Sequence, residues 1–148
     1  MAGNPLIIHS RIVEFSETDR AGIVHFSNFF KWMESAEAQW FRSVGVPLIE
    51  TTDGVTRGWP RVRVKADFHE PVLFDDKVET HLTIKEVRIR AIVYGFRFYK
   101  IVEDSKVHVA TGSMTTVFAH RVDQTGEMQS AAIPDLLLKA AEAASADG

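Results

Sequence analysis

The chain has no cysteine among its 148 residues, which excludes disulfide bonds, thiolate metal sites and a cysteine nucleophile. Its histidines lack the close spacing that a zinc site requires. They stand at His9, His25, His69, His81, His108 and His120. No glycine-rich loop of the kind that cradles phosphate occurs either. We therefore expect neither a metal site nor a P-loop.

Long apolar runs and a large excess of one charge are also missing. No apolar stretch approaches the roughly 20 residues that cross a bilayer, and the N-terminal segment lacks the basic start of a signal peptide. The net charge of −3 gives no reason to expect a nucleic acid partner. The apolar fraction of 45% and the charged fraction of 25% are typical of a globular protein. We therefore expect one domain over residues 1–148, in a cytoplasmic protein without membrane insertion.

The segment 14–45 contains one long amphipathic helix. At 3.6 residues per turn its apolar residues form a broad aromatic face, made of Phe29, Phe30, Trp32, Met33, Ala36, Trp40, Phe41 and Val44. Glu37 is the exception, since its angle places it inside the apolar arc. Ser27 is the expected N-cap, and Gly45 followed by Pro47 ends the helix. So wide an apolar face predicts a helix that a sheet wraps around.

Most of the other periodic segments alternate as strands do. Strands are predicted over residues 6–15, 61–69, 78–87, 91–103 and 107–120, with an irregular connection over 46–60 and a short C-terminal helix opened by Pro134 and Asp135. In the strand 61–69, Val62, Val64, Ala66 and Phe68 alternate with Arg61, Arg63, Lys65, Asp67 and His69. This order predicts an α+β fold, an antiparallel five-stranded sheet wrapped round one long helix. The exposed edge of so small a sheet favours pairing with a second copy.

Asp19 lies in a short loop just ahead of the helix. A carboxylate facing the unpaired N–H groups of a first helical turn is a plausible reactive group. The alternative is an Asx-turn or capping role, which aspartate often has at this position. Among the other acids nearby, Glu14 and Glu17 are expected to be solvated strand-end charges. Glu34 and Glu37 are expected either to face a pocket or to pair with an arginine.

The run Asp19-Arg20-Ala21-Gly22-Ile23-Val24-His25-Phe26, followed by Asn28-Phe29 and the helix, resembles the loop of hotdog-fold acyl-CoA thioesterases, in particular the 4-hydroxybenzoyl-CoA thioesterase-like group. The resemblance covers nearly the whole chain. It implies a homodimer or a dimer of dimers with active sites at the dimer interface. It also implies hydrolysis of a coenzyme A thioester without a metal or other cofactor.

The resemblance also implies roles for single residues. Asp19 matches the catalytic carboxylate, and Phe26 the position whose backbone N–H polarises the thioester carbonyl. Arg88 and Arg90 match a basic patch that binds the nucleotide phosphates, although a basic position of the family is Ile89 here. His25 stands one position earlier than the histidine that some relatives carry beside the helix, and it is retained as a candidate.

Two further expectations concern the shape of the site. Gly22 allows a tight turn beneath the substrate. If the strand 61–69 pairs with its symmetry mate, Gly58-Trp59-Pro60 lies beside the Asp19 loop of the other subunit, and Trp59 lines the acyl pocket.

The residues leave several questions open. Asp19 can act as a nucleophile or as a general base, and the acyl group is not identified. A hotdog hydratase or dehydratase is a rival function, as is a module that binds acyl-CoA or acyl carrier without catalysis.

Overall fold

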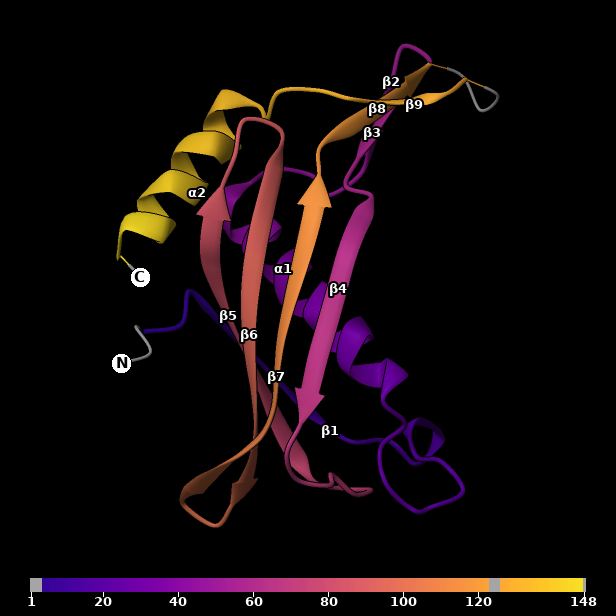
Figure 1. The fold of residues 1–148 in the computed structure, drawn as a ribbon, viewed down its shortest axis with the longest axis vertical. Helices are drawn as coiled ribbons and strands as arrows, with labels where there is room; N and C mark the ends of the chain where they lie inside the picture. Colours follow the sequence, from indigo (N-terminus) through magenta and orange to yellow (C-terminus); the bar gives the residue numbers. More distant parts are fainter. Residues whose placement is uncertain (1–3, 123–125, 148) are drawn as a thin grey trace.

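The computed structural model describes residues 4–122 and 126–147, and these form two sheets and two α-helices (Figure 1). The larger sheet is antiparallel, in the order β1-β5-β6-β7-β4. Its strands are β1 (Ile7–Ile12), β4 (Arg61–Phe68), β5 (Lys77–Val87), β6 (Ala91–Val102) and β7 (Ser105–Val117). The predicted α+β class and the five-stranded antiparallel sheet are confirmed.

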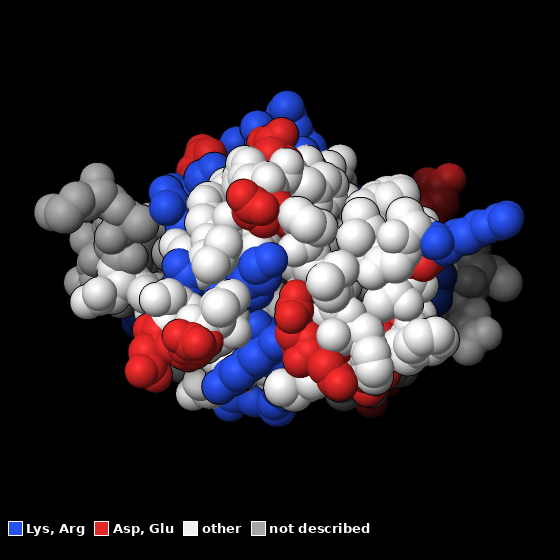
Figure 2. Space-filling model, turned by 90° about the horizontal axis from the view of Figure 1, so that it is seen from below, with Lys and Arg blue, Asp and Glu red and all other residues white. Residues whose placement is uncertain are grey.

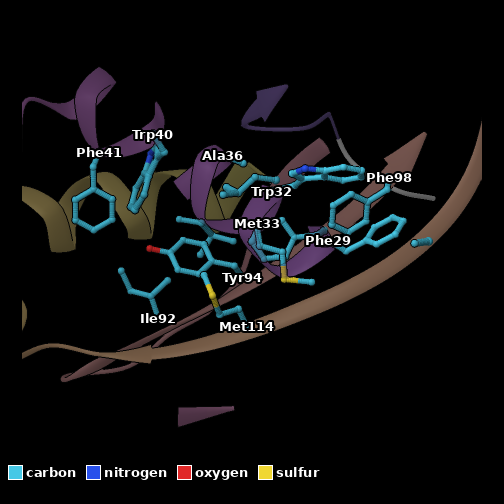
Figure 3. Close-up of a cluster of buried hydrophobic side chains, with 14 of the residues drawn as sticks. Phe29, Trp32, Met33, Ala36, Trp40, Phe41, Ile92, Tyr94, Phe98 and Met114 are labelled. Atoms are coloured by element: carbon cyan, nitrogen blue, oxygen red, sulfur yellow. The ribbon is translucent and has the colours of Figure 1, made fainter. Parts of the chain in front are cut away.

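The central helix α1 (Ser27–Val44) crosses one face of this sheet (Figure 1). Its aromatic face points at side chains of β6 and β7, among them Tyr94, Phe98 and Met114 (Figure 3). Helix and sheet approach closely at Gly112, where a Cβ atom would collide with the side chain of Met33. Gly45 ends the helix in the left-handed conformation, with φ 84°, as the sequence predicts.

The predicted N-cap is wrong by one residue. Ser27 is the first helical residue and Phe26 occupies the N-cap position, without a side-chain cap of its own. His25 supplies the acceptor instead, because its Nδ1 lies 3.3 Å from the Ser27 amide nitrogen and 2.7 Å from Ser27 Oγ.

The connection predicted to be irregular over residues 46–60 contains two strands, which corrects that prediction. The strands β2 (Glu50–Thr52), β3 (Val55–Gly58), β8 (Ala119–Val122) and β9 (Met128–Ser130) form the second sheet. β3 pairs with β8 just as β4 pairs with β7, so the small sheet continues that ladder past a break at Trp59-Pro60 and Phe118. Its strands lie largely in contact with solvent, which is why hydrophobic alternation does not reveal them.

The helix α2 (Asp135–Asp147) packs against β5, beside residues that β1 does not reach (Figure 1). It begins after Pro134, as the sequence predicts. A short 3₁₀ turn, η1 (Phe15–Glu17), leads from β1 into the Asp19 loop. Among the described residues no helix has both the length and the hydropathy needed to cross a membrane.

The strict alternation predicted for residues 61–69 fails at its first residue. Arg61 pairs with Thr116 and Arg63 with Thr115, so a β-bulge separates them. A bulge redirects a side chain, and here it turns Arg61 from the solvent face towards α1.

Candidate active site

The loop from Thr18 to Val24 is a tight turn closed by backbone hydrogen bonds. Thr18 and Val24 form an isolated antiparallel bridge, and the Asp19 N–H donates to the Ile23 carbonyl at 2.8 Å. The Gly22 N–H donates to the Asp19 carbonyl at 3.0 Å, and Gly22 adopts φ 84°. This region of φ strains residues with a Cβ, so the expected use of Gly22 in a tight turn is confirmed.

The Asp19 side chain is half-buried, and its Oδ1 accepts a hydrogen bond from the Ala21 N–H at 2.9 Å. This is the Asx-turn contact that was the alternative to a reactive role. The contact uses one carboxylate oxygen, and Oδ2 has no hydrogen-bond partner among the described residues. The turn therefore orients the carboxylate and leaves one oxygen available.

A pocket of about 420 Å³ opens beside this carboxylate. It is bounded by the loop, the start of α1 and the connection that follows β4. Its lining residues are Asp19, Ile23, Val24, Phe26, Phe29, Phe68, His69, Glu70, Pro71 and Val72. The walls are mainly apolar and aromatic, which suits an apolar group held next to a reactive carboxylate.

The loop lies at the lower end of the molecule as drawn in Figure 1. Seen from that end, acidic and basic side chains are intermixed with uncharged surface, and neither sign dominates (Figure 2).

Phe26 contributes its backbone to this site. Its side chain is 56% exposed, and its N–H stands at the N-terminus of α1 without an acceptor among the described residues. An unpaired N–H at a helix start is the geometry that binds a negatively charged oxygen. His25 is exposed, and its ring lies tilted against that of Phe26 with centroids 4.6 Å apart, but it is not part of the pocket wall.

Glu17 is 8% exposed, so the prediction of a solvated charge is wrong. Its carboxylate accepts hydrogen bonds from Arg11 Nη2 at 2.7 Å, Trp32 Nε1 at 2.9 Å and the Glu14 N–H at 2.8 Å. Burial raises the pKa of Glu17, but the hydrogen bonds from Glu14, Trp32 and Arg11 outweigh it and hold the pKa below its usual value. The signal for this site was Trp32, since a buried indole N–H needs an acceptor.

Glu37 is fully buried and pairs with Arg61, whose Nη2 lies 2.5 Å from Glu37 Oε1. Arg61 also binds Glu34 at 2.9 Å and the Trp59 carbonyl at 2.7 Å. Of the two expectations for Glu34 and Glu37, pairing with an arginine is the one observed. Burial raises the pKa of Glu37 to about 7, even though Arg61 opposes the shift.

Arg88 and Arg90 lie in the turn between β5 and β6, far from Asp19 in the same chain. Arg88 forms two 3.0 Å hydrogen bonds with Glu86, and Arg90 donates to Ser130 at 3.3 Å. The turn adjoins Val117 on β7, whereas the pocket end of β4 adjoins Ala110. Ala110 and Val117 are seven residues apart along β7, so the pocket end of β4 and the turn lie about 24 Å apart.

Trp59 is 6% exposed and packs between Phe41 and Phe118, in the core of its own chain. It does not line the Asp19 pocket of that chain. Its indole offers little surface to a substrate bound by a second subunit.

Comparison with known proteins agrees with this architecture. The sequence pattern of the Thioesterase-like superfamily matches residues 13–141. The chain belongs to this superfamily.

Among individual relatives of the superfamily, a protein of Aquifex aeolicus is 34% identical over 95 residues, 63% of this chain and 72% of its own. The 4-hydroxybenzoyl-CoA thioesterase of Pseudomonas sp. is 33% identical over 84 residues, 55% of this chain and 59% of its own. The second match thus spans less than two thirds of that relative.

A solved structure of a 1,4-dihydroxy-2-naphthoyl-CoA thioesterase from Synechocystis superposes with a TM-score of 0.75 at 21% identity, covering 95% of this chain and 96% of its own. This likeness concerns the fold, and the hotdog fold expected from the sequence is confirmed.

The structure places Asp19 and Phe26 at one pocket, and Gly22 in the same loop outside the pocket wall. Arg88, Arg90 and Trp59 lie elsewhere in the same chain, and His25 lies beside the pocket. The wall formed by Phe68 to Val72 was not predicted, because nothing in its sequence shows that the end of β4 folds back next to the loop.

Proposed function

We propose that this chain is an enzyme that hydrolyses a coenzyme A thioester to a free acid and coenzyme A. One observation carries the proposal: Asp19 and Phe26, with its unpaired N–H at the start of α1, line the same apolar pocket. The names of relatives support it, because they include a 4-hydroxybenzoyl-CoA thioesterase and a 1,4-dihydroxy-2-naphthoyl-CoA hydrolase.

Thioester hydrolysis needs attack on the carbonyl carbon and a donor for the charge that develops on the carbonyl oxygen. In our scheme the Phe26 N–H donates to that oxygen. Asp19 either takes a proton from a water, whose oxygen attacks the carbon, or attacks the carbon itself to form an anhydride that water then hydrolyses. In both routes the carbon–sulfur bond breaks and the sulfur leaves as the coenzyme A thiolate.

The acyl group in this scheme is apolar and of moderate size, with an aromatic ring as the favoured choice. The aromatic side chains of Phe26, Phe29 and Phe68 line a pocket of about 420 Å³, and rings pack well against such walls. Both relatives named above act on aromatic acyl groups by name.

The phosphates of coenzyme A are proposed to reach Arg88 and Arg90 of a second copy. β4 is the edge strand of the five-stranded sheet, and its Val62 and Phe68 are 59% and 48% exposed. Antiparallel pairing of β4 with a twofold mate brings the start of one β4, and the nearby 88–90 turn, towards the pocket end of the other. Within one chain about 24 Å separates the 88–90 turn from the Asp19 pocket. In the proposed dimer, one subunit supplies the pocket and the other supplies the turn.

The test is the release of free thiol from a panel of aromatic, short-chain and long-chain acyl-CoAs. Asp19→Asn is expected to lower kcat by about 10²–10⁴-fold, because it removes the base or nucleophile without changing the size of the side chain. Asp53→Asn, the same chemical change in the exposed β2–β3 turn, is the matched control and should keep full turnover. Normal turnover of Asp19→Asn on the best substrate contradicts the assignment.

The same assay addresses the rival functions and the arginines. A hydratase or a binding module releases no thiol from any member of the panel. Replacing Arg88 and Arg90 with Ala should raise KM for acyl-CoA while hardly changing hydrolysis of the matching pantetheine thioester, which lacks the nucleotide. Equal losses on both substrates indicate structural damage instead.

A further inference from the structure

Glu17 connects the parts of the chain that meet at the proposed active site. Its carboxylate binds Arg11 of β1, Trp32 of α1 and the Glu14 N–H at the start of η1. Arg11 also lies over the Trp32 ring, with Cζ 5.1 Å from the ring centroid. One carboxylate thus ties the lead strand to the central helix two residues before Asp19.

The backbone of Glu17 makes a second set of contacts. Its carbonyl accepts hydrogen bonds from the His25 N–H and from Asn28 Nδ2, both at 2.9 Å. Asn28 is buried and also donates to the His25 carbonyl at 3.1 Å. Glu17 and His25 are therefore joined across the base of the loop that carries Asp19.

These contacts fix both reacting groups relative to one point. Asp19 follows Glu17 by two residues. Phe26 comes directly after His25, whose N–H donates a hydrogen bond to the Glu17 carbonyl. We propose that Glu17 is the positioning residue of the site: it sets the separation between the Asp19 carboxylate and the Phe26 N–H. This inference rests on the proposed function for its kinetic consequence, but not for its structural one.

A carboxylate suits this role better than an amide. Glu17 Oε2 accepts from Arg11 and Trp32 while Oε1 accepts from Glu14. A glutamine has one acceptor oxygen and an NH₂ group, which would face donors that it cannot serve. Glu17→Gln therefore loses at least one of the three bonds and loosens the loop without removing Asp19.

The test compares Glu17→Gln with Glu37→Gln. Glu37 is the matched control, because it is also a buried carboxylate paired with an arginine, but it lies outside the pocket. Because small misplacements of catalytic groups cost up to roughly 10²-fold in rate, kcat of Glu17→Gln should fall by about tenfold or more while KM changes little. Glu37→Gln should keep kcat. Equal kcat values for the two variants, or a parallel loss in both, overturn the proposal.

Trp32→Phe is a second variant, which keeps an aromatic ring at this position and removes the N–H donor to Glu17 together with part of the buried indole. This variant should also lower kcat, by a smaller factor than Glu17→Gln does. Its kcat decides whether Glu17 positions the site if Glu17→Gln does not fold. Unchanged kcat in a folded Trp32→Phe together with a folded Glu17→Gln of normal kcat refutes the role.

Amide hydrogen exchange separates this proposal from the proposed function. Exchange over residues 18–26 should accelerate in Glu17→Gln and not in Glu37→Gln, whatever the wild-type protein hydrolyses. If the wild type releases no thiol but exchange accelerates as expected, the proposed function fails and the positioning of the loop stands. Unchanged exchange in Glu17→Gln overturns the positioning role.

Discussion

Glu17 and Glu37 are both buried and both paired with an arginine, yet their pKa values shift in opposite directions. Glu37 is 0% exposed, and within the described part of the chain Arg61 is the donor whose hydrogen bonds reach its carboxylate, so burial dominates and raises its pKa to about 7. Glu17 lies nearer the surface and receives bonds from three different donors, which together lower its pKa. An arginine partner alone does not keep a buried carboxylate ionised; the number of donors and the access to water decide.

Both side chains have an unpaired polar atom nearby in the part of the chain that the structure describes. Around Glu17, Arg11 Nη2, Trp32 Nε1 and the Glu14 N–H donate to the carboxylate, whereas Arg11 Nε is buried without a hydrogen-bond partner among the described residues. Beside Glu37, the hydroxyls of Tyr94 and Thr116 are buried without a hydrogen-bond partner among the described residues. Burial and the nearby Glu37 carboxylate raise the pKa of Tyr94. The Glu17 network thus joins β1 to α1 beside the proposed site, the Glu37 network holds β4 against α1, and each leaves buried polar atoms unpaired within the described chain.

The largest effect should come from breaking the more deeply buried pair. Arg61→Met leaves Glu37 without its cation and should lower the free energy of unfolding by about 3–5 kcal/mol at pH 8, the usual cost of an uncompensated buried charge. Arg11→Met should cost less, since Glu17 keeps its bonds from Trp32 and Glu14. Urea unfolding of both variants measures the difference, and a larger loss for Arg11→Met contradicts the comparison.

The next effect is the pH dependence of stability. Because the folded pKa of Glu37 is above that of the unfolded chain, its contribution is fully present below pH 4.5 and is lost as the pH rises towards and through 7. The loss amounts to about 3 kcal/mol over this window. Glu37→Gln should flatten the stability profile there, as measured by urea unfolding between pH 4.5 and 8.

Glu17 has the opposite sign. Its lowered pKa stabilises the fold above pH 4.5, and this contribution is lost as the pH falls through the folded pKa. Glu17→Gln should therefore flatten only the acid side of the profile. Identical profiles for the two glutamine variants would show that the two carboxylates do not differ as described.

The smallest effect should come from Tyr94→Phe. It removes a buried hydroxyl that has no hydrogen-bond partner in the part of the chain that the structure describes, so the free energy of unfolding should change by no more than about 1 kcal/mol, and in the favourable direction. The measurement is the urea midpoint at pH 8. A loss well above 1 kcal/mol would mean that the hydroxyl binds Glu37 or Thr116 in solution.

Much of the architecture followed from local patterns. The aromatic face of α1 and three of the five main strands appear in the sequence with bounds within one residue of those observed, because burial of one face imposes a period on the chain. A fourth, predicted over 6–15, ends at Ile12, ahead of η1. The fifth, predicted over 107–120, breaks at Phe118 into β7 and β8. Gly22 and Gly45 mark their turns because the left-handed conformation favours residues without a Cβ.

The sequence by itself determined the fold class, the central helix and the position of Asp19 ahead of that helix, since each depends on residues close together in the chain. Only the tertiary structure decided which charges are buried. Arg61 turns inward because β4 carries a bulge opposite β7, and Glu17 is buried because Arg11 and Trp32 reach it from β1 and α1. Such contacts join residues distant in sequence, and the residue types alone do not reveal them.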